Sequence, residues 1–284
     1  MIDTVDNKKS SWLGNLELVY RCQQEETKVT SVYAQAPFKI QRPFYPEGKQ
    51  ICHSVIIHTA GGIVGGDRLH QNIHLQPKTQ ALITTPAANR IYRSNGHKAE
   101  QDIKIIIDDG ASLEYLPQET IVFKGANFRQ NLRVELSTEK STWLGWEIIR
   151  FGRSARGEIF DQGEWRSYTE VWQQGKPLWV DNQFLPGNEE LFYSLNGLAG
   201  KPVVGTLSWI GKSVTPNLVQ EVINRWQPQK DNSEIGVTQL LQGLLCRYRG
   251  DSITEVKNWF IQVWQLLRQT EGRSSHKKPR VWLI

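Results

Sequence analysis

Sulfur-containing residues are scarce in this sequence of 284 residues, which holds one methionine and three cysteines. Cys22, Cys52 and Cys246 are odd in number, far apart and not spaced as a C-x-x-C pair. This pattern argues against a disulfide framework and against a paired-cysteine metal site. We therefore expect the protein to work in a reducing compartment, the cytoplasm.

Long apolar runs are also missing from the sequence. No run approaches the ~20 residues that a transmembrane helix needs, and the opening stretch MIDTVDNKKSSW lacks the apolar centre of a signal peptide. The formal net charge is only +5, with lysine and arginine spread along the chain. One basic cluster, residues 273–280, favours a solvated tail, with nucleic acid or an acidic partner as the alternatives. We expect neither a membrane nor a nucleic acid as partner.

Nucleotide-binding loops are absent as well, although four glycines gather in HTAGGIVGGDRL, residues 58–69. The dinucleotide pattern G-x-G-x-x-G fails: if Gly61 is its first glycine, its second glycine falls at position 63, which is Ile63. The phosphate-loop pattern fails because Asp67 replaces its lysine, and a carboxylate repels phosphate. A tight bend between two strands remains, where glycine permits close backbone approach. The functional alternative is that this bend lets Asp67 project into an internal passage or an interface.

Alternation with a period of two, the pattern of β-strands, is abundant. In QDIKIII, Ile103, Ile105 and Ile107 fall on one face, and Gly175 marks a hairpin turn. Turn residues recur at short intervals without intervening helical periods, which favours a mainly β fold over βαβ units. We predict a single domain over residues 1–284, with a β body at about 13–210.

The pattern changes after residue 210. Thr215 and Ser252 are each suited to cap the start of a helix. An apolar stripe of helical period at 253–267 predicts a helix packed on the β body, with a partner groove as the alternative. We therefore predict a helical part at about 211–270, containing a polar loop at 227–236, and a basic tail at 271–284.

Residues that could hold a metal are few and scattered. His70 and His74 are predicted to lie on a strand, where four residues span roughly 13 Å, too far to share one ion. Cys52 and the adjacent histidine point to opposite faces of a strand. No H-E-x-x-H motif is present. We expect no stable metal site, while transient coordination by Asp67, His58 or Cys52 stays open.

Several acids stand in apolar surroundings, namely Glu119, Glu147 and Glu170. Arginines follow nearby in sequence, and buried charges are usually paired, so structural ion pairs are one interpretation. A row of polar groups along a wet internal path is the other. An open cleft that brings Glu119 close to Glu170 would instead indicate a hydrolase. An open groove of aromatic side chains would indicate a carbohydrate- or small-ligand-binding β protein; its candidates are Trp143, Trp146, Trp165, Trp172 and Trp179.

Five segments together resemble the UreD (UreH) family of urease accessory proteins. They are GGIVGGDRL, TTPAANRIYRS, LEYLPQETIVFKGA, GRSARGEIFDQGEWRS and KPRVW, in the family's order from about Leu16 to Trp282. One departure is Arg90, where the family often carries lysine. Charge is kept there, but the planar fork of arginine makes contacts that differ from those of a lysine point charge.

The resemblance implies a mainly β fold with β-helix-like layers and α-helices toward the C-terminus. It implies a non-enzymatic scaffold or chaperone that binds apo-urease with UreF and the GTPase UreG. Nickel(II) would be handled transiently, through an internal passage, with no tightly bound cofactor. The resemblance makes Asp67, Glu119 and Glu170 candidates for passage or interface roles, and His58 and Glu147 join them on the grounds given above. The residues matching family motifs are Gly61, Gly62, Gly65, Gly66, Tyr92, Arg93, Arg153, Arg156, Gly157 and Glu158.

Overall fold

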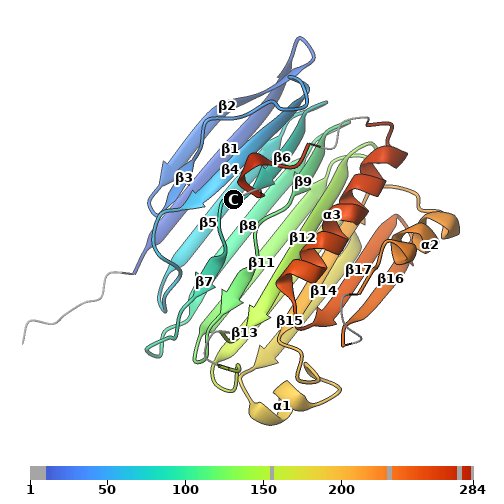
Figure 1. Ribbon diagram of the computed structural model, residues 1–284. Helices are drawn as coiled ribbons and strands as arrows, with labels where there is room; N and C mark the ends of the chain where they lie inside the picture. The colour runs from blue at the N-terminus through green and yellow to red at the C-terminus, as the bar shows by residue number, and fades with distance from the viewer. Residues whose placement is uncertain (1–10, 154–156, 229–231, 274–276, 283–284) are drawn as a thin grey trace, which may run out of the picture.

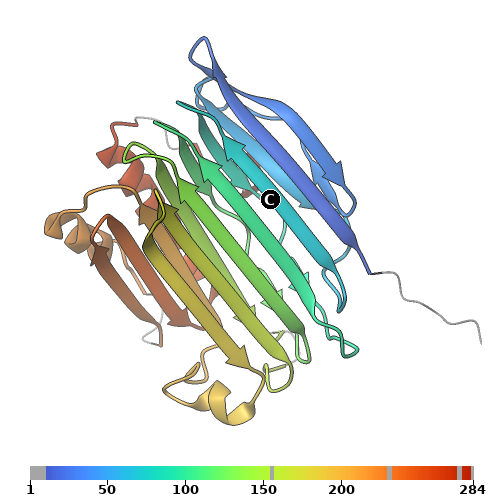
Figure 2. The ribbon, with the colours of Figure 1, turned by 180° about the vertical axis from the view of Figure 1, so that it is seen from behind.

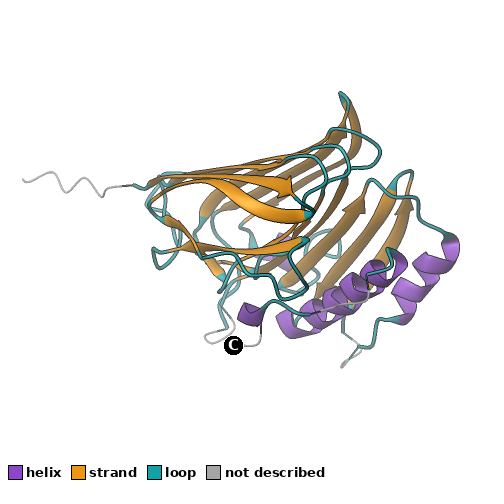
Figure 3. Cartoon of the chain, turned by 90° about the horizontal axis from the view of Figure 1, so that it is seen from above, coloured by secondary structure: helices purple, strands orange, loops and turns teal. Residues whose placement is uncertain are grey.

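Two stacked β-sheets and a layer of helices make up the computed structural model, which describes residues 11–153, 157–228, 232–273 and 277–282 (Figure 1). Seen from above, α2 and α3 cover the outer face of one sheet (Figure 3). The other sheet faces the viewer in Figure 2, with the helices behind it. We call the seven-stranded sheet sheet 1 and the ten-stranded, helix-covered sheet sheet 2. The mainly β fold class with helices near the C-terminus is confirmed.

Sheet 1 has the strand order β14-β13-β11-β8-β5-β1-β2. Its central neighbours, from β1 through β5, β8 and β11 to β13, pair in parallel, while β2 and β14 are antiparallel edges. The bounds are β1 Leu13–Gln23, β2 Glu26–Gln35, β5 Arg68–Leu75, β8 Ala99–Ile107, β11 Asn127–Leu136, β13 Glu164–Gln173 and β14 Lys176–Pro186.

Sheet 2 has the order β16-β17-β15-β12-β9-β6-β4-β3; in addition, β10 pairs with β12, and β7 pairs with β10. Its members β4, β6, β9 and β12 pair in parallel. The bounds are β3 Phe38–Ile40, β4 Ile51–His58, β6 Gln80–Thr84, β7 Asn89–Ile91, β9 Ser112–Tyr115, β10 Thr120–Val122, β12 Thr142–Phe151, β15 Val203–Ile210, β16 Glu234–Leu240 and β17 Gly243–Gly250.

The chain winds between the sheets in the manner of a β-helix. It passes from β4 in sheet 2 to β5 in sheet 1, back to β6, on to β8, and so forth until β13. Period-two alternation turns one face of each strand inward. Ile103, Ile105 and Ile107 on β8 are all buried, as their spacing predicts. Burial of each such side chain contributes about 1.5–3 kcal/mol, so the space between the sheets forms the main core.

Helix α3, Ile253–Thr270, packs its apolar stripe on sheet 2, as predicted. The side chain of Ser252 caps its first turn by accepting from the backbone N–H of Glu255 at 3.2 Å. Gly205 on β15 permits the close approach, because a Cβ there would lie 2.6 Å from Val256. The other helices are α1 Glu189–Tyr193, α2 Pro216–Asn224, which Thr215 caps as predicted, and the short 3-10 helix η2 Arg280–Trp282. Among the described residues, no helix combines the length and apolarity needed to cross a membrane.

A buried charge network ties the end of α3 to sheet 2. Arg268 is 1% exposed and contacts Glu114 on β9 at 2.8 Å and Glu47 at 2.5 Å. Burial alone would raise the pKa of Glu47, but hydrogen bonds from His53 and Arg268 outweigh burial and leave it below its ordinary value. Arg273 adds a second guanidinium on Glu114 at 2.8 Å. Each buried carboxylate and the buried guanidinium therefore have a partner of opposite charge, and this pairing offsets the cost of removing them from water.

Two expectations for the C-terminal part are wrong. Residues 211–270 are not wholly helical, because β16 and β17 extend sheet 2 between α2 and α3, and β16 begins inside the predicted loop 227–236. Alternation of period two on β17 buries Leu244, Cys246 and Tyr248 under the helices. The tail at 271–284 is only partly solvated. Lys277, Lys278 and Arg280 are exposed, but Arg273 joins the charge network and the ring centre of Trp282 lies 5.1 Å from that of Trp146.

Candidate functional site: a polar cavity between the sheets

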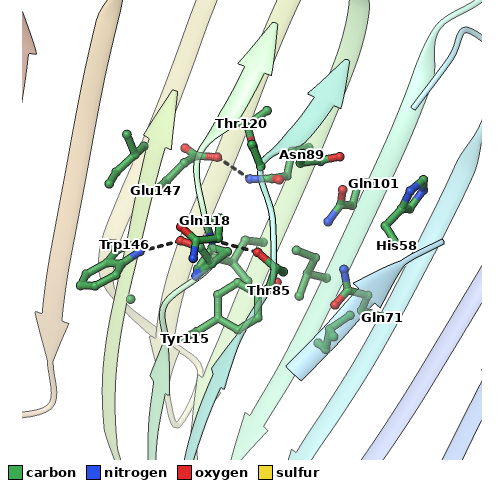
Figure 4. Close-up of a pocket in the computed structure, with 18 of the residues that line it drawn as sticks. His58, Gln71, Thr85, Asn89, Gln101, Tyr115, Gln118, Thr120, Trp146 and Glu147 are labelled. Atoms are coloured by element: carbon green, nitrogen blue, oxygen red, sulfur yellow. Dashed lines mark hydrogen bonds between the residues drawn. The ribbon is translucent and has the colours of Figure 1, made fainter. Parts of the chain in front are cut away.

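A cavity lies between the two sheets and is lined by side chains of both (Figure 4). About 150 Å³ is open to the centres of water-sized molecules. One water needs about 10–15 Å³ on that measure, so the space suits on the order of ten waters. Its polar lining residues are His58, Gln71, Thr85, Asn89, Arg90, Gln101, Gln118, Thr120, Gln130, Glu147, Thr169, Asp181, Thr206 and Ser208.

Glu147 of β12 is a half-buried carboxylate that lines this cavity. It accepts hydrogen bonds from Nε2 of Gln130 at 2.6 Å and from Oγ of Ser167 at 3.2 Å, both of sheet 1. Burial, with a smaller contribution from the carboxylate of Asp181, raises the pKa of Glu147 to about 7, although these hydrogen bonds and the charge of Arg247 lower it. The group therefore exchanges a proton near neutral pH, which is a frequent property of functional carboxylates.

Asp181 of β14 lies at the same end of the cavity. Its carboxylate contacts the guanidinium of Arg247 on β17 at 2.7 Å. Arg247 also donates to Oγ1 of Thr206 on β15 at 2.7 Å. This end of the cavity thus combines two carboxylates with one guanidinium.

Uncharged donors and acceptors gather at the other end, near β4 and β5. Burial lowers the pKa of His58, so its imidazole favours the neutral form. Its Nδ1 lies 3.1 Å from the carbonyl oxygen of Ala60, which assigns the proton to Nδ1 and leaves the Nε2 lone pair free. Within the described parts of the chain, Nε2 of His58 and Oε1 of Gln71 are buried without a hydrogen-bond partner. Figure 4 shows both side chains on this side, beside Gln101.

A break in sheet 2 supplies part of the cavity wall. Strand β6 continues into β7 only after residues 85–88, and β9 into β10 only after 116–119. Backbone groups freed by the break find side-chain partners: the N–H of Gln118 donates to Oγ1 of Thr85 at 2.9 Å, and Nε1 of Trp146 donates to the carbonyl of Pro117 at 2.8 Å. The break therefore brings polar loop groups to the cavity, while the backbone N–H of Gln118 and the carbonyl of Pro117 still have hydrogen-bond partners.

Comparisons with known proteins agree with the resemblance of the motifs. The pattern of the family described as UreD urease accessory protein matches residues 13–283. The chain belongs to the UreD family. It is 58% identical over 273 residues to the urease accessory protein UreD of Nostoc punctiforme, covering 96% of each chain. It is 59% identical over 271 residues to the protein of that name from Trichormus variabilis, covering 95% of this chain and 96% of the relative. The corresponding protein of Synechocystis sp. is 40% identical over 262 residues, which are 92% of this chain and 97% of the relative.

The glycine–aspartate motif of this UreD-family chain forms a tight crossing beside β7. A Cβ on Gly62 would lie 2.5 Å from the carbonyl oxygen of Arg90, and one on Gly65 would lie 2.6 Å from that of His97. Gly66 has a φ of +96°. Gly61 has open space around it among the described residues. Close backbone approach thus explains most of the glycine cluster, as the structural interpretation predicts.

Asp67 stabilises this crossing through hydrogen bonds from two backbone amides. Its side chain is fully buried. Oδ1 accepts from the backbone N–H of Trp12 at 2.8 Å and Oδ2 accepts from that of Val64 at 2.9 Å. Both oxygens are therefore engaged by backbone amides, and the cavity is lined by neighbouring residues of the motif such as Gly62. This geometry favours a structural role over the predicted passage role.

The other UreD motifs assemble at the same end of the molecule. Tyr92 donates to the carbonyl of Gly61 at 3.0 Å. The aliphatic part of Arg93 lies against Gly125, where a Cβ would be 2.9 Å from its Cγ. Arg153 and Glu158 form an ion pair, and Glu158 also accepts from the backbone N–H of Lys124 at 3.0 Å. Arg156 lies outside the described residues, and Gly157 has a φ of +61°. The described motif residues thus act mainly as supports for the loops around the cavity.

Glu119, Glu170 and Cys52 lie in different places. Glu119 sits in the break of sheet 2, where its charge acts on Lys257 of α3. Glu170 points to the outer face of sheet 1 and contacts Arg133 at 2.9 Å, so it stays an interface candidate and does not line the cavity. Cys52 is buried in the core, and burial raises the pKa of its thiol. Cys52 is therefore a poor transient ligand, since metals bind the thiolate.

Two alternative functions lose their structural basis. Trp143, Trp146 and Trp165 are buried, while Trp172 contacts Arg133 on the outer face of sheet 1. Trp179 is half-buried and lines the cavity together with Trp143 and Trp146. The five tryptophans therefore do not share one open groove, which the ligand-binding alternative requires. The hydrolase alternative loses its basis because Glu170 faces the outer side of sheet 1 and neither Glu119 nor Glu170 lines the cavity. Throughout the described ranges, no group of three His, Cys, Asp or Glu side chains is placed to share a metal ion.

Sequence reasoning missed the inward-facing polar residues Gln71, Gln101, Gln130, Asp181 and Arg247. The first three occupy inward positions of adjacent strands, where the inward residues on either side are apolar and buried. Gln101 and Gln130 are direct cross-strand partners. A glutamine in the apolar phase of a strand, repeated on three parallel strands, is the pattern that could have revealed the cavity.

Proposed function

We propose that this chain is a non-enzymatic scaffold that binds apo-urease together with UreF and the GTPase UreG, and that nickel(II) reaches urease through the cavity between the sheets. The observation that carries the proposal is the set of polar side chains that line a cavity inside a β-solenoid whose core is otherwise apolar. The names of the relatives support a role in urease maturation. The failed phosphate-loop pattern supports placing nucleotide hydrolysis in a partner.

The donors at the two ends suit a borderline cation that is held weakly. Imidazole is a ligand that nickel accepts, and the free Nε2 of His58 offers one lone pair. Glu147 offers a carboxylate once it loses its proton, and metal binding itself favours that loss. Ordered water can complete the coordination in a cavity of this volume. We therefore propose nickel(II) as a transient cargo and no tightly bound cofactor.

The compartment is part of the same proposal. Cys22, Cys52 and Cys246 are all free thiols. Unpaired thiols are typical of a reducing environment. We propose that the complex with urease, UreF and UreG forms in the cytoplasm.

The test is a co-expression experiment. The tagged chain is produced with UreF, UreG and apo-urease, and the captured complex is assayed for urease content and for nickel-dependent activation. Glu147→Gln keeps an acceptor for Gln130 but cannot ionise, so we expect capture to be unchanged and activation to fall. The matched control is Glu139→Gln, an exposed carboxylate in a turn. Failure to capture urease or UreF would refute the scaffold role, and full activation by the Glu147 variant would refute the passage.

A further inference from the structure

Arg247 joins the two sheets at one end of the cavity. Its neighbours on β17, Cys246 and Tyr248, are buried under the helices, so Arg247 faces the other way, toward sheet 1. Its guanidinium contacts Asp181 of β14 at 2.7 Å and donates to Oγ1 of Thr206 on β15 at 2.7 Å. Asp181 and Thr206 both line the cavity. Arg247 therefore occupies two of the polar atoms that a cation would meet at this end of the cavity, while Oδ2 of Asp181 accepts from Nε2 of Gln183 at 2.6 Å.

The charges at this end favour an incoming cation. Glu147 and Asp181 supply two carboxylates, and the positive charge of Arg247 acts on both. The side chain of Arg247 is 38% exposed, whereas that of Asp181 is 14% exposed. The guanidinium can thus move from Asp181 into water by rotation of its own side chain. The carboxylate that it leaves stays inside.

We propose that Arg247 is a displaceable counter-ion that sets how tightly the cavity holds a divalent cation. The inference rests on the proposed passage and adds the means of release. A dication that arrives at Asp181 must compete with the guanidinium, and a dication that has bound meets the returning guanidinium as a repulsive charge. Arg247 therefore weakens binding and shortens residence, which a conduit requires and a storage site does not.

The choice of arginine fits this role. A planar guanidinium can contact a carboxylate and a hydroxyl on two different strands at once, whereas the lysine ammonium acts as a single point charge. Arg247→Lys therefore keeps the charge and loses the fixed geometry. We expect its nickel affinity to lie between those of the wild-type chain and Arg247→Met.

The experiment measures nickel(II) binding to the full-length chain without partners, by equilibrium dialysis with metal analysis, and nickel release by stopped-flow transfer to a chromophoric chelator. Arg247→Met should bind nickel about tenfold more tightly or better and release it correspondingly more slowly. Adding Asp181→Asn to Arg247→Met should return the affinity to the wild-type range or below. The matched control is Arg249→Met. Arg249 lies on the same face of β17 as Arg247, but the carboxylate that it contacts is that of Glu234.

Three results would overturn the inference: unchanged affinity in Arg247→Met, the same gain in Arg249→Met, or a gain that survives Asp181→Asn. Thermal unfolding of each variant shows whether it is folded. If Arg247→Met does not fold, the nickel affinity of Arg247→Lys, which keeps the charge, tests the same inference. Nickel binding that depends on Glu147 but ignores Arg247 would refute the counter-ion alone. Absence of nickel binding from the wild-type chain and from every variant would refute the passage as well.

Discussion

Glu147→Gln should stabilise the protein increasingly as the pH rises. The folded chain raises the pKa of Glu147 from 4.5 to about 7, chiefly through burial. The folded state therefore binds this proton more tightly than the unfolded state. The stability that the protonated carboxyl contributes is fully present below pH 4.5 and is lost as the pH rises through about 7.

The magnitude follows from the two pKa values. Each unit of pKa corresponds to about 1.36 kcal/mol, so ionising Glu147 in the folded state costs about 3 kcal/mol in total. Between pH 5 and pH 8, the free energy of unfolding of Glu147→Gln should gain about 2–3 kcal/mol relative to the wild-type chain. Glutamine keeps a carbonyl acceptor for Gln130 and Ser167 and carries no charge at any of these pH values.

Urea unfolding of both proteins at pH 5, 6, 7 and 8 measures this difference directly. Other titrating groups cancel in the comparison when they do not contact Glu147. Glu139→Gln, at an exposed turn, should run parallel to the wild-type chain at every pH. A constant difference between the Glu147 variant and the wild-type chain would refute the reasoning. It would mean that water in the cavity solvates the carboxylate well enough to keep its pKa ordinary.

Three further predictions concern the supports of the cavity. Arg268→Met should lower the free energy of unfolding by about 3 kcal/mol, because it removes the guanidinium that two buried carboxylates share and leaves Glu114 only Arg273 and Glu47 only His53 as basic partners among the described residues; urea unfolding checks this, with the exposed Arg280→Met as the neutral control. Gly62→Ala should lower the thermal midpoint while Gly61→Ala leaves it almost unchanged, since only the first Cβ meets a backbone oxygen, at 2.5 Å. Asp67→Asn exchanges one acceptor oxygen for a donor that faces a backbone N–H, so it should cost about 1–3 kcal/mol by urea unfolding; reduced urease activation with unchanged stability would instead restore the passage role.

Much of the fold follows from period-two alternation, since burial of Ile103, Ile105 and Ile107 needs only local spacing. The helix starts at Thr215 and Ser252 were equally predictable, because capping is a local interaction. Strand β16 could not be predicted in the same way. Its side chains are mostly exposed or half-buried, and it pairs with β17 at one edge of sheet 2, so tertiary pairing rather than pattern determines it.

The site was less predictable than the fold. Local sequence context points to Glu147 and His58, and both line the cavity. Asp67 and Glu170 carry the same chemistry, yet one is taken up by backbone amides and the other faces outward. Which side of a strand faces inward depends on register in the assembled sheets, and register depends on every neighbouring strand.

The polar cavity is costly for a β-solenoid, and that cost is an argument for its use. A buried polar atom without a partner costs about 1–3 kcal/mol, while an aliphatic side chain of similar size would pack there at a gain. Gln71 and His58 each expose such an atom to the cavity, within the part of the chain described. Structural support alone would favour leucine at these positions, as at Leu69 beside them. Water restores the missing hydrogen bonds only while the space stays wet, so these residues favour a hydrated interior over a dry core. A hydrated interior lined by one free imidazole lone pair and two carboxylates is what a weakly held cation needs to exchange ligands one at a time.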